Sequence, residues 1–170
     1  MAVRTRAPKL RRQWIARPNA LAALGNTLDF ALVLLTAPAG YGKTALASQY
    51  AASQPSVCAW LTLTAEERDP ANMAGMMRES ILGLHPELRT VAPAECAEPQ
   101  PTAKTLISLL SAQGVAPLTL VLDDLGSVDD APRAIELLYT LARNAPEGIT
   151  FLALSRALPR PAPDPLVARQ

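Results

Sequence analysis

The chain has 170 residues and a net charge of +1, and 49% of its residues are apolar against 18% charged. This length fits one domain, and this composition excludes an intrinsically disordered chain, which has few apolar residues and a high net charge. Aromatic residues make up only 4%, so the core has to be built from Leu, Val, Ile and Ala, which suits helices packed on a parallel sheet better than a β-sandwich.

Residues 1–17 are the most basic part of the chain and include no acidic residue. Their basic residues are Arg4, Arg6, Lys9, Arg11, Arg12 and Arg17. We expect a solvated basic arm here, with contact to nucleic acid or an anionic membrane as the alternative. The segment lacks the apolar stretch of a signal peptide, and the longest apolar run, residues 30–35, is too short to cross a bilayer. Cys58 and Cys96 lack metal-binding spacing, so we expect no metal site at these cysteines. Because Cys58 lies within an apolar strand pattern, we expect a reduced, buried thiol, which fits a cytoplasmic protein.

From residue 18 onward, helix and strand patterns alternate. A short helix is expected at residues 18–24, ending at Gly25 and Asn26. Nearly continuous apolar runs predict four strands covered on both faces, at residues 30–36, 57–63, 118–123 and 149–155. Helix patterns lie at residues 43–52, 70–84, 103–113 and 132–143.

Capping signals support the starts of three helices. They are Asp69 before Pro70, Thr102 before Ala103, and Asp130 close before Pro132. Parallel strands joined through helices need right-handed crossovers. The expected fold class is therefore α/β, a three-layer sandwich around a mostly parallel sheet.

The first strand runs directly into Ala37-Pro-Ala-Gly-Tyr-Gly-Lys-Thr44 and then into a helix, which is the context of a phosphate-binding P-loop. Gly40 and Gly42 permit backbone angles that let successive N–H groups surround an anion at the helix start. We expect Lys43 to reach the β- and γ-phosphates of ATP and the Thr44 hydroxyl to bind Mg²⁺. The nucleotide-binding residues expected here are Ala39, Gly40, Tyr41, Gly42, Lys43, Thr44 and Ala45. Ala37 replaces the first glycine of the motif; the alternative is a glycine turn followed by Lys-Thr by chance.

The third predicted strand ends in Asp123 and Asp124, as a Walker B strand does. We expect Asp123 to hold Mg²⁺ through water and Asp124 to orient or activate the attacking water; the alternative is a simple turn toward Gly126. The fourth strand ends in Ser155 and Arg156. In P-loop proteins of the additional-strand type, this strand lies between the strand before the P-loop and the Walker B strand, and a polar residue at its end senses the γ-phosphate. Arg156 is therefore a candidate γ-phosphate sensor; the alternative is a solvated arginine.

Several segments together are similar to one known family. They are Ala16-Arg-Pro18, Leu35-Thr-Ala-Pro-Ala-Gly-Tyr-Gly-Lys-Thr44, Ala59-Trp-Leu-Thr-Leu63 with Asp69-Pro70, Leu120-Val-Leu-Asp-Asp124 and Leu154-Ser-Arg156. Over about residues 9–169, the chain resembles the N-terminal part of the ATPase domain of LuxR-type transcriptional regulators of the maltose-activator kind, which are signal-transduction ATPases with numerous domains. The resemblance implies that Arg17 and Pro18 lie near the adenine. It also implies that ATP with an inducer drives self-association, which slow hydrolysis resets.

The chain departs from that family by stopping at Gln170, before the fifth strand, lid, winged-helix, sensor-repeat and DNA-binding regions. Without the fifth strand, residues 30–36 would form an exposed apolar edge; a truncated product, a fragment and one half of a split system all remain open.

The expected organisation is a basic arm at 1–17, a truncated P-loop NTPase core at 18–156 and a Pro-rich tail at 157–170. The expected function is an ATP-binding switch module without specific DNA or membrane contact of its own. A small P-loop phosphotransferase and an inactive fragment are the alternatives.

Overall fold

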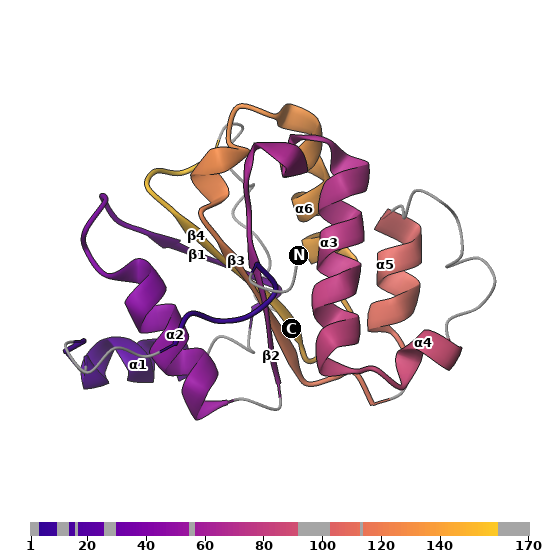
Figure 1. The fold of residues 1–170 in the computed structure, drawn as a ribbon, viewed down its shortest axis with the longest axis horizontal. Helices are drawn as coiled ribbons and strands as arrows, with labels where there is room; N and C mark the ends of the chain where they lie inside the picture. The colour runs from indigo at the N-terminus through magenta and orange to yellow at the C-terminus, as the bar shows by residue number, and fades with distance from the viewer. Residues whose placement is uncertain are drawn as a thin grey trace.

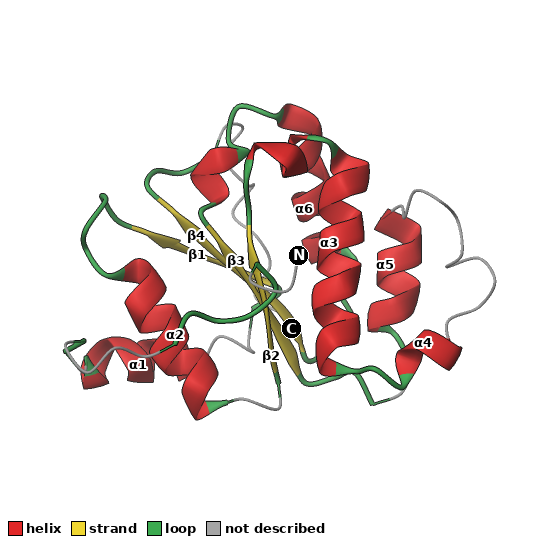
Figure 2. Cartoon of the chain, viewed as in Figure 1, coloured by secondary structure: helices red, strands yellow, loops and turns green. Residues whose placement is uncertain are grey.

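A four-stranded parallel sheet with helices on both faces forms the centre of the fold (Figures 1 and 2). The computed structural model describes residues 4–9, 14–15, 17–25, 30–54, 57–91, 103–112 and 114–159. The strands are β1 (Leu32–Thr36), β2 (Cys58–Thr62), β3 (Leu118–Asp123) and β4 (Ile149–Ser155). They lie in the order β1-β4-β3-β2, and all three pairs are parallel. The expected α/β three-layer sandwich is confirmed, as is the expected place of β4 between β1 and β3.

Each strand contributes side chains to two hydrophobic cores, one on each face of the sheet. On one face, α1 (Pro18–Gly25) and α2 (Lys43–Ser53) pack against strand residues such as Trp60 and Leu152. On the other face, Leu61 and Phe151 belong to the core built with three helices. These are α3 (Pro70–Leu84), α5 (Ala103–Leu110) and α6 (Pro132–Arg143). Neighbouring strand residues point to opposite faces, so a sheet covered twice needs the continuous apolar runs seen in the sequence.

Short helical segments complete the chain. They are the 3₁₀ helices η2 (Ala65–Arg68) and η4 (Leu125–Ser127) and the short helix α4 (Leu88–Val91). None of the helices in the part of the chain that the structure describes is long and apolar enough to span a membrane. Of the features expected from the sequence, Arg11, Arg12, Asn26, Cys96, Thr102, Gln113 and residues 160–170 lie outside the described residues.

The helix boundaries agree with the expected ones to within one residue, except at the end of α5. Asp69 caps α3, its carboxylate accepting a hydrogen bond of 3.0 Å from the Ala71 amide. Helix α6 begins with Pro132 in its first turn, as expected, but it has no side-chain cap, and the Asp130 carboxylate pairs with Arg68 at 3.0 Å. Helix α5 ends at Leu110, earlier than expected.

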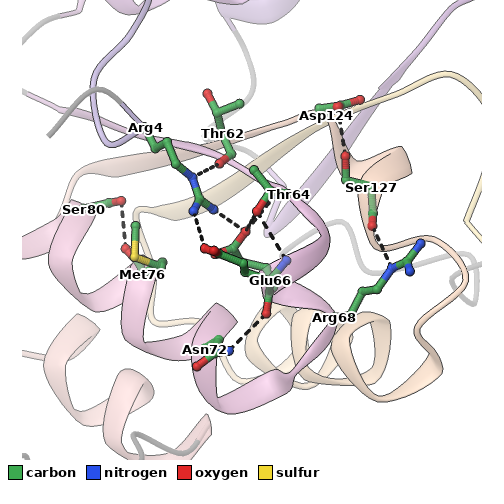
Figure 3. Close-up of polar contacts among 11 residues, drawn as sticks. Arg4, Thr62, Thr64, Glu66, Arg68, Asn72, Met76, Ser80, Asp124 and Ser127 are labelled. Carbon is green, nitrogen blue, oxygen red and sulfur yellow. Dashed lines mark hydrogen bonds and ion pairs between the residues drawn. The ribbon is translucent and has the colours of Figure 1, made fainter. Parts of the chain in front are cut away.

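The N-terminal segment differs from the solvated arm that we expected, because Arg4 is anchored to the outer edge of β2. The Thr62 amide donates to the Arg4 carbonyl at 2.8 Å, and Arg4 Nε donates to the Thr62 carbonyl at 3.2 Å. The Arg4 guanidinium also pairs with Glu66 at 2.9 Å and with Glu67 (Figure 3). Further along the segment, Arg6 and Lys9 are exposed.

The Arg4 contact satisfies a buried acid. Glu67 is only 1% exposed, and its carboxylate accepts hydrogen bonds from the Thr64 amide at 2.8 Å and from the Thr64 hydroxyl at 2.9 Å. Burial alone would raise the pKa of Glu67, but the hydrogen bonds from Arg4 and Thr64 outweigh it and lower that pKa below its ordinary value. The arginine therefore stabilises the turn that follows β2.

Candidate functional site

The carboxyl ends of the strands meet at one edge of the sheet, where they line a cleft of about 350 Å³. Parallel register brings Thr36 level with Ser155 and Thr62 level with Asp123. We call this the strand-end cleft. Its walls come from the loop between β1 and α2, the start of α2, and the ends of β2, β3 and β4. Ligands of open α/β sheets bind at such an edge.

The loop between β1 and α2 depends on two glycines. Gly40 has φ 83° and Gly42 has φ 79°, and Gly42 precedes the first residue of α2. A Cβ atom at either position would meet nothing within 4 Å. Glycine is therefore required by the left-handed backbone rather than by space, at a cost of roughly 1 kcal/mol for another residue.

Lys43 folds back over this loop. Its Nζ donates to the Ala37 carbonyl at 2.6 Å and to the Pro38 carbonyl at 3.1 Å. The ammonium group is thus held at the mouth of the loop, beside the first turn of α2, where anions are favoured by the free N–H groups and the helix dipole.

A hydrogen bond joins Thr44, at the start of α2, to Asp123, at the end of β3. Thr44 Oγ1 donates to Asp123 Oδ1 at 3.0 Å, and the Asp124 amide donates to the same oxygen at 2.9 Å. Asp123 is 9% exposed. Burial raises the pKa of Asp123 above its ordinary value, although these two hydrogen bonds act in the opposite direction. A buried carboxylate of this kind gains from a nearby cation.

Asp124 lines the same cleft in an unusual backbone conformation. Its φ of 59° and ψ of 48° are left-handed, and it is the only non-glycine residue with positive φ among those described. Such a conformation costs of order 1 kcal/mol or more and is common at functional sites. Ser127 Oγ donates to Asp124 Oδ2 at 2.9 Å (Figure 3).

The end of β4 forms another wall of the strand-end cleft. Ser155 is buried, and its carbonyl accepts a hydrogen bond of 3.2 Å from the Ala37 amide. Arg156 is exposed and lines the cleft. Lys43 and Arg156 are the cationic residues of its described lining. Both side chains carry the positive charge that an anion in the cleft would need.

A second cleft of about 360 Å³ lies on the other side of the loop, and Gly40 lines both. Its other lining residues are Trp14, Ile15, Arg17, Tyr41, Gly42, Ala45, Leu46 and Gln49. Arg17 Nη1 donates to the Tyr41 carbonyl at 3.1 Å, which fixes the segment before α1 against the loop. The exposed side chains of Ile15 and Tyr41 give this cleft an apolar surface suited to a planar ring.

The two clefts collect most of the residues expected from the sequence. The strand-end cleft includes Ala39, Gly40, Lys43, Thr44, Asp123, Asp124 and Arg156, and the second cleft includes Arg17, Tyr41, Gly42 and Ala45. Pro18 is exposed at the start of α1 and belongs to the described lining of neither cleft.

Other lining residues were missed from the sequence. Thr62 ends β2, beside Asp123, and its position at the carboxyl end of a parallel strand was a usable signal. Trp14, Ile15 and Gln49 line the second cleft, but nothing in their spacing predicts that the Ile15 carbonyl lies against Gln49 of α2.

Cys58 carries no sign of reactivity. The thiol is half-buried, and burial raises its pKa to about 11, so it stays protonated at neutral pH. Among the described residues, no group of three or more His, Cys, Asp and Glu side chains could hold a metal ion. Magnesium needs no such group, because it keeps several waters and is bound by one or two protein ligands together with substrate phosphates.

A scan against protein-family models finds no match to this chain.

Proposed function

We propose that the chain binds Mg-ATP, with the phosphates in the strand-end cleft and the base in the second cleft. The observation that carries the proposal is the 3.0 Å contact between Thr44 Oγ1 and Asp123 Oδ1, which joins a glycine loop to an acidic strand end 79 residues away. A hydroxyl and a carboxylate that close to one lysine form a donor set that suits a magnesium ion bound to a polyphosphate.

The residues present fit this ligand. Lys43 already holds its ammonium group on two carbonyl oxygens of the loop, and it would exchange them for phosphate oxygens. Thr44 would hold Mg²⁺ directly and Asp123 through water, since Mg²⁺ dehydrates reluctantly. When bound, the metal ion would neutralise charge on the β- and γ-phosphates.

Two further residues would act on the terminal phosphate. Asp124 would accept a hydrogen bond from the attacking water and orient it. Arg156 would contact the γ-phosphate, so that its surroundings differ between ATP and ADP. In the second cleft, Tyr41 and Ile15 would cover the base, while Arg17 bonds the Tyr41 carbonyl.

Calorimetric titration of Mg-ATP into the chain tests the proposal. Lys43→Ala should weaken binding about tenfold to a hundredfold, because it removes charge-assisted hydrogen bonds worth about 1.5–3 kcal/mol. Lys104→Ala, an exposed lysine on α5, is the matched control and should bind like the wild type. Equal affinity of the wild type, Lys43→Ala and Lys104→Ala for Mg-ATP would show that the glycine loop does not bind the phosphates.

We further propose that the bound nucleotide acts as a switch, as in the regulators that the sequence resembles, and that hydrolysis is slow. Because the γ-phosphate is the only difference between the two nucleotides, a contact such as that of Arg156 would make the protein respond to ATP and not to ADP. In the regulators that the sequence resembles, self-association also needs an inducer, so the switch is tested on the chain alone by limited proteolysis. Mg-ATP should protect the chain more strongly than Mg-ADP does, whereas equal protection by both nucleotides would contradict a switch and leave nucleotide binding intact.

A further inference from the structure

The residue that holds Asp124 in place can be identified from the turn that follows β3. The Ser127 amide donates to the Asp124 carbonyl at 2.9 Å, and the Ser127 hydroxyl donates to Asp124 Oδ2 at 2.9 Å. Ser127 therefore bonds both the backbone and the side chain of the same aspartate. It lies in η4, next to the cleft but outside its lining.

Ser127 is itself fixed from the neighbouring turn. Arg68 Nε, in η2, donates to the Ser127 carbonyl at 3.2 Å, and the Arg68 guanidinium pairs with Asp130 at 3.0 Å. Figure 3 shows Asp124, Ser127 and Arg68 in one chain of contacts. These contacts hold the backbone of Ser127, from which its hydroxyl reaches Asp124.

This tether separates the two neighbouring acids. Asp123 accepts hydrogen bonds from Thr44 and from the Asp124 amide, whereas the Asp124 carboxylate takes the Ser127 hydroxyl. With Oδ2 occupied, rotation of the Asp124 carboxylate is restricted, and no hydrogen bond from the described part of the chain takes Oδ1, which can therefore accept one from water. The left-handed backbone of Asp124 places this group at the cleft instead of along the strand.

We propose that Ser127 is a positioning residue for ATP hydrolysis, which it promotes by holding the Asp124 carboxylate in the orientation that accepts the attacking water. The inference rests on the proposed function, because Asp124 has this role only if Mg-ATP occupies the strand-end cleft. Ser127 would not contact the nucleotide, so its loss should change turnover and leave nucleotide affinity unchanged.

Single-turnover hydrolysis of Mg-ATP with protein in excess, together with calorimetric binding of Mg-ATP, tests the inference. Ser127→Ala should bind within about twofold of the wild type and hydrolyse about tenfold more slowly, as expected for loss of one hydrogen bond to a charged group. Ser127→Thr keeps the hydroxyl, so it should hydrolyse Mg-ATP at least about threefold faster than Ser127→Ala. Ser111→Ala is the matched control, since Ser111 is exposed and its hydroxyl donates to the Ile107 carbonyl of α5.

The outcomes separate the two proposals. Wild-type rates in Ser127→Ala, rates raised above wild type, or a threonine variant as slow as the alanine variant would each overturn the positioning role while leaving ATP binding intact. A parallel loss of binding and hydrolysis in Ser127→Ala would show a purely structural role and would also overturn it. If the wild type fails to bind Mg-ATP, or binds it as Lys43→Ala does, the proposed function fails and the inference with it.

Discussion

At the scale of single residues, the two adjacent acids at the end of β3 differ in their surroundings. Asp123 is buried and accepts a hydrogen bond from the Thr44 hydroxyl of α2, while Asp124 is half-buried and bonded within its own turn. Both acids could be predicted from the sequence because acidic residues follow a long apolar run. Their different partners could not, since the left-handed backbone of Asp124 becomes visible only in the folded turn.

The raised pKa of Asp123 gives a prediction on stability. A carboxyl group whose pKa is raised by folding stabilises the protein while protonated, and this contribution is lost as the pH rises through the raised value. The Asp123→Asn side chain is neutral at every pH and keeps an oxygen that can accept the Thr44 hydrogen bond. Without Mg²⁺, the variant should therefore have a higher melting temperature than the wild type at pH 7.5. The difference should shrink toward pH 3. Thermal unfolding in EDTA checks this, and a variant less stable than the wild type at pH 7.5 would contradict it.

At the scale of elements, the strands and the glycine loop followed from local sequence, but the path of the N-terminal segment did not. Continuous apolar runs and the glycines of residues 40–42 act locally, so the pattern itself predicts the structure. Arg4 meets Glu67 only because β2 is an outer strand of the sheet. That partnership spans 63 residues, and no periodicity in the sequence encodes it.

This contact predicts a stability cost when Arg4 is removed. Arg4→Ala would leave the buried Glu67 carboxylate without its cation, at a cost of about 1–3 kcal/mol near pH 7. Folding lowers the pKa of Glu67, so the stabilisation exists above its ordinary pKa and is lost as the pH falls through the lowered value. The cost should therefore be smaller at pH 3, as measured by urea unfolding.

Arg6→Ala is the matched control for the N-terminal segment, since Arg6 is exposed. It should change the free energy of unfolding by less than about 0.5 kcal/mol. Equal stability of the Arg4→Ala and Arg6→Ala proteins at pH 7 would show that the segment is a solvated arm after all.

At the scale of the whole molecule, the fold was more predictable than the site. The order of elements, the three layers and the place of β4 followed from the alternation of apolar strands and helices, because each local preference agrees with the overall fold. The two clefts draw on segments far apart in the chain. Residues without a motif, such as Thr62 and Gln49, could therefore be assigned to them only after the elements were placed.

The most direct test of Mg-ATP binding in these clefts is a titration of the ¹⁵N-labelled chain with Mg-ATP, followed by the backbone amide resonances. The account predicts that the amides of Gly40, Gly42, Lys43 and Thr44 shift most, together with that of Asp124 across the cleft. It also predicts that the amides on the far face, in α3 and α5, stay in place. Saturable shifts confined to that far face, or no shift at millimolar Mg-ATP, would contradict it.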